Sequence, residues 1–337
     1  MSRDSPRLSV SPLLTRRTLL AASLGAMTVG LTSCTDVRAT SDLWSSSRRM
    51  WGAFLPGIAS GSAQTSLGRL EELANFRPNI LTLYASTKDS LSTSGISGVH
   101  GAQAVPLITL EPWRPAEGNV QREFTLSSIG SGQHDADLER WALQLAAWER
   151  PALLRFAQEM NGTWYPWSIG VGGNTPQQYR DAWSRMHAII ADKAPNVRFV
   201  WAPNTITEGT RDFVDCYPGD DVVDYLGLDG YNWGQSPGHQ WQSVDKLFLK
   251  SLDVLGQVST RRPILITEVG CADGATPDLK AKWITDFFDL IEDRANVAGF
   301  LWFQMDKERD WRFNSTPAST RSFRAGLARW MGGAQTG

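Results

Sequence analysis

Short apolar runs alternate along the chain with longer segments that repeat apolar residues at helical spacing. Eight of these runs lie between residues 50 and 303, and they are rich in β-branched and aromatic residues. This alternation is typical of a parallel sheet covered by helices. The predicted strands are Met50–Leu55, Asn79–Tyr84, Ala104–Leu110, Ala152–Ala157, Val197–Trp201, Val222–Leu228, Pro263–Thr267 and Val297–Phe303.

The segments between the runs carry helix signals. Thr175, Pro176 and Gln178 form a capping-box start, and the residues that follow repeat on one helical face. Thr276 and Pro277 open another helix in the same way. Eight strands with their helices fit a (β/α)8 barrel, whose usual size is about 250 residues. We therefore predict an α/β chain with one (β/α)8 TIM barrel over residues 49–333 and no second domain.

The first 33 residues have the layout of an export signal. Arg16 and Arg17 directly precede an apolar run from Leu19 to Leu31, and this arrangement resembles a twin-arginine signal. The run ends at Cys34 in a sequence that resembles a bacterial lipobox. It is shorter than the ~20 apolar residues that span a membrane. We expect Cys34 to carry lipid, residues 34–48 to be a tether, and the protein to be a lipoprotein on the outer face of the cytoplasmic membrane or extracellular.

The amino-acid composition limits the kinds of molecule that this chain is expected to bind. The 337 residues include 33 Lys+Arg against 35 Asp+Glu, so no basic excess supports nucleic-acid binding. Only four His and no CxxC motif occur, which gives no support to a zinc site. We expect no metal or organic cofactor, a monomer, and membrane attachment through the lipid alone. Cys216 and Cys271 remain after the signal, and a disulfide between them stays open because sequence cannot supply its geometry.

Carboxylates and aromatic residues follow the predicted strands, at the barrel face where chemistry is expected. Glu159 follows the fourth strand and Glu268 follows the seventh. Two Glu residues facing each other across a barrel mouth suit the cleavage of a glycosidic bond, which needs one protonated and one ionised carboxyl group. Retention of configuration requires carboxyl groups about 5–5.5 Å apart.

Three segments resemble glycoside hydrolase family 26. The run RFAQEMNGTWYPW from Arg155 to Trp167 resembles the acid/base motif of that family, and YLGLDGYNW and ITEVG resemble its sixth and seventh strands. The resemblance implies a (β/α)8 barrel that hydrolyses β-linked polysaccharides with retention. The substrate in this family is most often β-1,4-mannan, and sometimes β-1,3-1,4-glucan or β-1,3-xylan.

The same resemblance implies roles for individual residues. Glu159 would be the general acid/base, and Glu268 the nucleophile. Tyr231 would orient that nucleophile, and Trp164 and Trp302 would face the sugar. We add Arg155, Gln158 and Trp113 to the expected substrate-binding set. Gln158 departs from the family, which usually has His directly before the acid/base Glu, and this change could alter which sugar is accepted.

Each assignment has a structural alternative. Glu159 could form a salt bridge with Arg155, which lies on the same face of a strand four residues earlier. Asp229 and Glu111 also end strands, and we expect them to be orienting or structural groups. The aromatic residues could pack at the barrel top instead of binding sugar, and this choice is most open for Trp113, Trp233 and Trp311.

Three functions follow from the sequence. The first is an endo-acting β-glycan hydrolase, with β-1,4-mannan as the leading substrate. The second keeps the mechanism but changes the substrate to a β-1,3-1,4-glucan or a β-1,3-xylan, because of Gln158. The third is a surface lipoprotein that binds carbohydrate without cutting it. The presence of both carboxylates argues against the third. Whether the action is endo or exo depends on loop shapes that the sequence does not reveal.

Overall fold

The computed structural model describes residues 49–58 and 63–332. The predicted export signal, the predicted lipidation at Cys34 and the predicted tether all lie outside these residues. None of the helices in the described part of the chain is long and apolar enough to cross a membrane.

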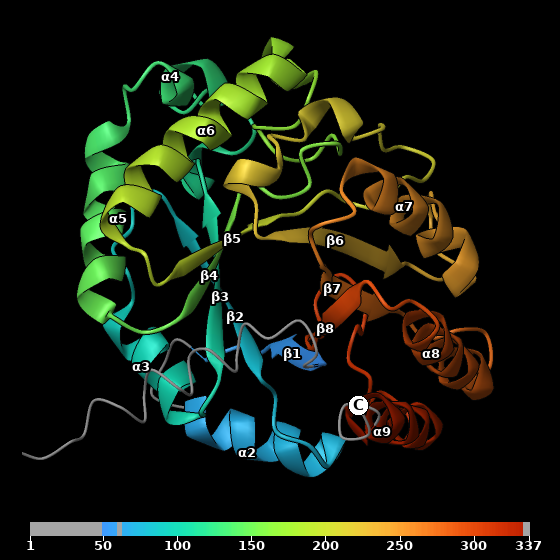
Figure 1. Cartoon of the computed structure of the whole chain (residues 1–337). Helices are drawn as coiled ribbons and strands as arrows, with labels where there is room; N and C mark the ends of the chain where they lie inside the picture. Colours follow the sequence, from blue (N-terminus) through green and yellow to red (C-terminus); the bar gives the residue numbers. More distant parts are fainter. Residues whose placement is uncertain (1–48, 59–62, 333–337) are drawn as a thin grey trace, which may run out of the picture. The chain divides into compact units, whose positions relative to one another are not determined.

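Eight parallel strands close into a barrel in the order of the sequence (Figure 1). Every strand pairs with its sequence neighbours, and β1 pairs with β8. The (β/α)8 prediction is therefore confirmed. The strands are β1 (Met50–Phe54), β2 (Ile80–Ser86), β3 (Val105–Glu111), β4 (Ala152–Phe156), β5 (Val197–Trp201), β6 (Tyr225–Asn232), β7 (Ile264–Cys271) and β8 (Val297–Phe303).

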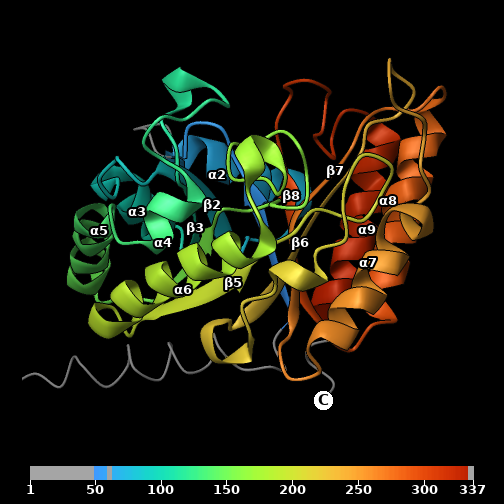
Figure 2. The ribbon, with the colours of Figure 1, turned by 90° about the horizontal axis from the view of Figure 1, so that it is seen from above.

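Helices surround the barrel (Figure 2). They are α2 (Ala63–Ala74), α3 (Thr93–Gly101), α4 (Leu126–Gly130), α5 (Asp135–Trp148), α6 (Pro176–Lys193), α7 (Val244–Val258), α8 (Pro277–Glu292) and α9 (Pro317–Gly332), with short 3-10 turns in the loops. The capping box predicted at the start of α6 is present, because the Thr175 and Gln178 side chains each accept a hydrogen bond from the other residue's backbone N–H.

Two strands match their predicted bounds, four differ by one or two residues at an end, and β6 and β7 differ most. The strand β6 begins at Tyr225 instead of Val222, because Asp220–Val222 forms a 3-10 turn. The strand β7 continues past Thr267 to Cys271, so Glu268 lies within the strand and not after it. Both thiols in the described residues, Cys216 and Cys271, are free and buried, which resolves the open question of a disulfide.

The inside of the barrel is layered. The lower part is a cluster of large apolar side chains that includes Val105, Leu153 and Leu301. Above it lies a buried polar layer, in which every side chain belongs to a residue at most 1% exposed: Thr82, Thr109, Arg155, Asp229 and Thr267. A TIM barrel is normally filled with branched apolar residues, so this layer marks the end of the barrel where polar chemistry is built.

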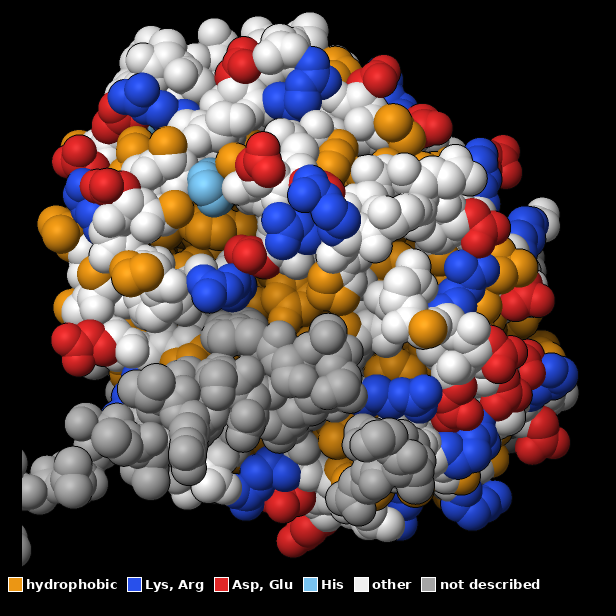
Figure 3. All heavy atoms as spheres, in the orientation of Figure 1, with side chains coloured by type: hydrophobic (Ala, Val, Ile, Leu, Met, Phe, Trp, Pro, Cys, Tyr) orange, Lys and Arg blue, Asp and Glu red, His pale blue; other side chains and the backbone are white. Residues whose placement is uncertain are grey.

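The outer core lies between the strands and the helices and is rich in aromatic residues. Trp141, Trp183 and Trp283 are buried there, as the helical spacing of these residues predicts. On the face seen in Figure 3, acidic and basic side chains of the described residues are mixed. This mixture agrees with the near balance of charges in the sequence.

Candidate active site

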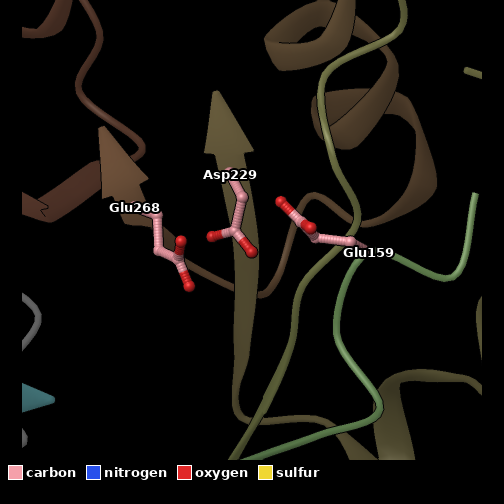
Figure 4. A group of neighbouring side chains, drawn as sticks. All are labelled: Glu159, Asp229 and Glu268. Carbon is pink, nitrogen blue, oxygen red and sulfur yellow. The ribbon is translucent and has the colours of Figure 1, made fainter. Parts of the chain in front are cut away.

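Three carboxylates converge above the polar layer (Figure 4). Glu159 follows β4, Asp229 lies on β6 and Glu268 lies on β7. One carboxylate oxygen from each residue lies within 4.8 Å of those of the other two. Glu159 and Glu268 keep 7% and 8% of their surface exposed, whereas Asp229 is fully buried. The two glutamates therefore remain open to the barrel mouth.

A bulge in β7 directs Glu268 toward the barrel interior. Leu228 of β6 pairs with Ile266, but the next residue, Asp229, pairs with Glu268. Thr267 is therefore an extra residue in the ladder. Such a bulge changes the alternation of side chains along a strand, and it lets Thr267 and Glu268 both face the interior. Thr267 donates a 2.5 Å hydrogen bond from its hydroxyl to Asp229 Oδ1.

Glu159 reaches the site through an unusual backbone conformation. The strand β4 ends at Phe156, and both Ala157 (φ 46°) and Glu159 (φ 56°) are left-handed. Non-glycine residues pay a steric cost in this region, and such residues concentrate at functional sites. A 2.8 Å hydrogen bond from the Glu159 N–H to the Ala202 carbonyl oxygen fixes the turn.

Glu268 is surrounded by strong donors. Tyr84 donates a 2.5 Å hydrogen bond to Oε1, Tyr231 donates to Oε2, and Arg155 also donates to Oε1. Burial and the charge of Glu268 raise the pKa of both tyrosines well above the usual value, so the hydroxyls keep their protons. Glu268 thus receives charge-assisted and neutral hydrogen bonds from one cation and two hydroxyl groups.

Arg155 joins Glu268 to the polar layer. It binds both carboxylate oxygens of Asp229 through Nη1, at 2.9 and 2.8 Å, and its Nε and Nη2 contact Thr109 Oγ1 at 3.0 and 2.8 Å. Burial raises the pKa of Asp229, and the Arg155 guanidinium opposes that shift. The three converging carboxylates could also hold a metal ion. However, Arg155 already brings a positive charge to Asp229 and Glu268.

Among the described residues, the hydrogen-bond partners of the Glu159 carboxylate are neutral. Asn204 Nδ2 and Trp164 Nε1 donate to its two carboxylate oxygens, each at 2.7 Å. Burial, followed by the charge of Glu268, raises the pKa of Glu159 to about 7. This carboxyl group can therefore hold or release a proton near neutral pH, as a general acid/base must.

Three expectations from the sequence need correction. Arg155 does not pair with Glu159, because its guanidinium binds Asp229 and Glu268. Arg155 and Gln158 are fully buried, so neither contacts a substrate directly. Gln158 instead donates a 2.8 Å hydrogen bond from Nε2 to Glu111 Oε1.

Trp302 also differs from the expectation of a sugar-facing ring. Along β8, Leu301 belongs to the interior cluster, so Trp302 points outward into the core beneath the helices. There it is fully buried, packs against Phe323, and donates from Nε1 to the Trp311 carbonyl oxygen at 2.8 Å. The neighbouring Phe303 points toward the site and stacks on Phe54.

The other predicted aromatic residues divide into two groups. Trp164 is 40% exposed beside Glu159, which suits a surface that stacks on sugar. Trp113 and Trp233 are half-buried, while Trp311 is buried against Tyr231 and serves packing.

Sequence reasoning missed two partners of the glutamates. Tyr84 and Asn204 both end or follow predicted strands, and each donates to one of the two glutamates. Their position at strand ends was the signal that could have identified them.

The comparisons with known proteins agree on one family. Residues 119–311 match the sequence profile of glycosyl hydrolase family 26. Endoglucanase H of Acetivibrio thermocellus is 33% identical over 281 residues, which cover 80% of this chain and 30% of that protein. A β-1,3-xylanase of Alcaligenes sp. is 24% identical over 244 residues, covering 67% of this chain and 50% of the relative. This chain thus spans half or less of the length of these curated relatives.

A solved structure supports the fold independently. The catalytic domain of a family 26 endo-β-1,4-mannanase from Bacillus sp. JAMB-750 superimposes with a TM-score of 0.64 at 16% identity, covering 87% of this chain and 90% of that domain. At this identity the likeness concerns the fold alone. Since the family profile covers more than half of the sequence, the chain belongs to glycosyl hydrolase family 26.

Proposed function

We propose that this chain is a retaining endo-acting β-glycan hydrolase. The observation that carries the proposal is the separation of the carboxylates at the barrel mouth, where oxygens of Glu159 and Glu268 lie within 4.8 Å of each other. Retaining glycosidases hold their carboxyl groups about 5–5.5 Å apart, whereas inverting enzymes leave about 6.5–9.5 Å for a water molecule. This close approach supports a double displacement.

Each residue has a defined task in this mechanism. Glu159 donates its proton to the leaving oxygen while Glu268 attacks the anomeric carbon and forms a glycosyl ester. Glu159, now ionised, takes a proton from water, and the water cleaves the ester. Tyr84 and Tyr231 hold Glu268 in position for the attack. Trp164 offers an exposed ring beside Glu159 for the leaving part of the chain.

Two substrates are supported by different observations. A β-1,3-1,4-glucan is favoured by the 33% identity with an endoglucanase and by Gln158, which stands where the family usually has His. A β-1,4-mannan is favoured by the resemblance of the acid/base motif to a family that acts most often on this glycan. We propose the β-glucan as the first substrate to test and the mannan as the second.

The experiment is a reducing-sugar assay of the purified protein on barley β-glucan, galactomannan, mannan, laminarin and xylan, with Glu268→Ala as the blank. The anomeric configuration of the first product, followed by proton NMR, tests the mechanism. We expect the β-anomer to appear before mutarotation. Formation of the α-anomer would contradict retention, and binding of glycans without cleavage would favour the carbohydrate-binding lipoprotein.

We also propose that the chain is exported and anchored through lipid on Cys34, on the basis of the twin arginines and the lipobox-like sequence. Palmitate labelling of the expressed full-length chain tests this proposal, with Cys34→Ala as the variant. Label in the wild type and none in the variant is the expected outcome. Equal labelling of both, or of neither, would contradict it.

A further inference from the structure

A third glutamate, Glu111, lies at the barrel mouth. Along β3, Val105 and Leu107 belong to the interior cluster, and Thr109 contacts Arg155 in the polar layer. By the alternation of the strand, Glu111 faces inward one step above Thr109. It is partly exposed, so it is the β3 side chain that a ligand in the mouth can reach.

The carboxylate of Glu111 is fixed but keeps free acceptor capacity. Gln158 Nε2 donates to Oε1 at 2.8 Å, and Trp113 Nε1 donates to Oε2 at 3.1 Å. A carboxylate accepts about four hydrogen bonds, so each oxygen retains room for another donor. Among the described residues, Glu111 has no ion-pair partner. Burial raises its pKa, and the hydrogen bonds from Gln158 and Trp113 oppose that shift.

An aromatic wall holds this arrangement in place. The rings of Tyr165 and Trp167 stack with centroids 4.3 Å apart, and Trp113 meets both edge to face. Trp167 Nε1 also donates to the Gln158 carbonyl oxygen at 2.7 Å. The Gln158 side chain is fully buried, and its Oε1 has no hydrogen-bond partner within the described part of the chain. The Gln158 side chain therefore meets the mouth through its Nε2 group, which donates to Glu111 and also interacts with Tyr165.

From this geometry we propose that Glu111 binds neighbouring hydroxyl groups of the sugar at the cleavage point, and that Gln158 sets substrate preference by positioning Glu111. The inference rests on the proposed glycanase function and names the residue that distinguishes one neutral β-linked hexose from another. Two hydroxyls on adjacent ring carbons match a carboxylate with one free acceptor direction on each oxygen. Their directions change with the configuration at each carbon, so a fixed carboxylate discriminates between sugars.

The test compares kcat/KM on barley β-glucan and galactomannan for wild type, Glu111→Gln, Gln158→Met and the double variant. Glu117→Gln is the matched control, because Glu117 is an exposed residue in the 3-10 turn that follows β3. We expect each single substitution to reduce the wild-type preference at least tenfold. Because Gln158 acts through Glu111, the double variant should show the same preference as Glu111→Gln alone, and the control should match wild type.

Two results would overturn the inference in an active enzyme. A preference that stays within twofold of wild type in Glu111→Gln would exclude sugar recognition by Glu111. Additive effects in the double variant would exclude action of Gln158 through Glu111. Calorimetric titration with cellohexaose and mannohexaose keeps the test independent of turnover. Glu111→Gln should weaken binding of the preferred hexasaccharide at least tenfold, and unchanged affinity would reject the proposal even if the wild type cut neither polysaccharide.

Discussion

The two glutamates that we propose as catalytic residues, Glu159 and Glu268, are the same residue type in opposite surroundings. Glu268 lies on a strand, above a buried guanidinium, and receives hydrogen bonds from Arg155, Tyr84 and Tyr231. Glu159 lies on a left-handed turn and receives hydrogen bonds only from the neutral Asn204 and Trp164. The Arg155 guanidinium contacts Glu268 directly, whereas it acts on Glu159 only at a distance.

This difference supports the roles that we propose for Glu268 as nucleophile and Glu159 as general acid/base. A nucleophile must be ionised before it attacks, whereas a general acid must still hold its proton. Arg155 stabilises the charge on Glu268, and that charge in turn raises the pKa of Glu159, which burial also raises. The Arg155 guanidinium beside Glu268 therefore makes the two glutamates differ in charge environment. Each prediction below tests whether the two sides are as different as their contacts indicate.

The largest effect is expected from loss of the nucleophile. Glu268→Ala should reduce kcat on the preferred polysaccharide by about 10⁴-fold or more, because no other group can form the glycosyl ester. Steady-state hydrolysis measures this loss, with Glu208→Ala, a substitution of an exposed loop residue, as the control. Added azide should restore turnover of an activated glycoside and give an α-glycosyl azide. Full activity of Glu268→Ala would show that Glu268 is not the nucleophile.

Loss of the acid/base should be smaller and should depend on the substrate. Glu159→Gln should reduce kcat on polysaccharide by about 10²–10⁴-fold, because the leaving oxygen no longer receives a proton. A dinitrophenyl glycoside has a leaving group that needs no proton, so formation of the ester should stay fast, and a burst of dinitrophenol should appear. Stopped-flow absorbance measures the burst. An equal loss on both substrates would show that Glu159 does not act as the acid.

The sequence predicted the strands that carry this site, because the apolar runs and the residues that follow them are local signals. The β5 and β8 boundaries agree with the apolar runs to the residue, and both glutamates follow or end predicted strands. The direction of a side chain at a strand end is not local information. Trp302 and Phe303 are adjacent aromatic residues, and only the closed barrel determines which of them faces inward.

The hydrogen-bond partners of the two glutamates could not be predicted from the sequence for a related reason. Arg155 and Glu159 are close in sequence, which suggested a salt bridge, but the turn after β4 leaves Arg155 to bind residues from β6 and β7. The bulge at Thr267 changes which side chains of β7 face the barrel interior, and the hydrophobic periodicity of the sequence does not indicate this change. The distant partner Tyr84 depends on barrel closure, because β2 and β7 meet only across the mouth.

The cost of holding Glu159 in a buried site should appear in stability. Its pKa rises from the usual 4.5 to about 7 on folding, so the folded state retains a proton that the unfolded chain releases. The free energy of unfolding should therefore fall as pH rises from about 4.5 to about 7. Glu159→Gln removes this penalty and should be more stable by up to about 3 kcal/mol at pH 8, with no such gain at pH 4. Urea unfolding at both values measures the difference, and a pH-independent gain would contradict the shifted pKa.

The smallest effect separates the two tyrosines that hold the nucleophile. The family resemblance named Tyr231 alone, but Tyr84 makes an equivalent hydrogen bond to the other oxygen of Glu268. Removing one hydroxyl deletes one hydrogen bond to a charged group, which is worth about 1.5 kcal/mol, or about tenfold in rate. Tyr84→Phe and Tyr231→Phe should each lower kcat by about this factor, while Tyr217→Phe, which loses a hydrogen bond to Asp220 away from the site, should not. If Tyr84→Phe kept full activity, Arg155 and Tyr231 would be sufficient to position Glu268, and the Tyr84 hydroxyl would have no part in the reaction.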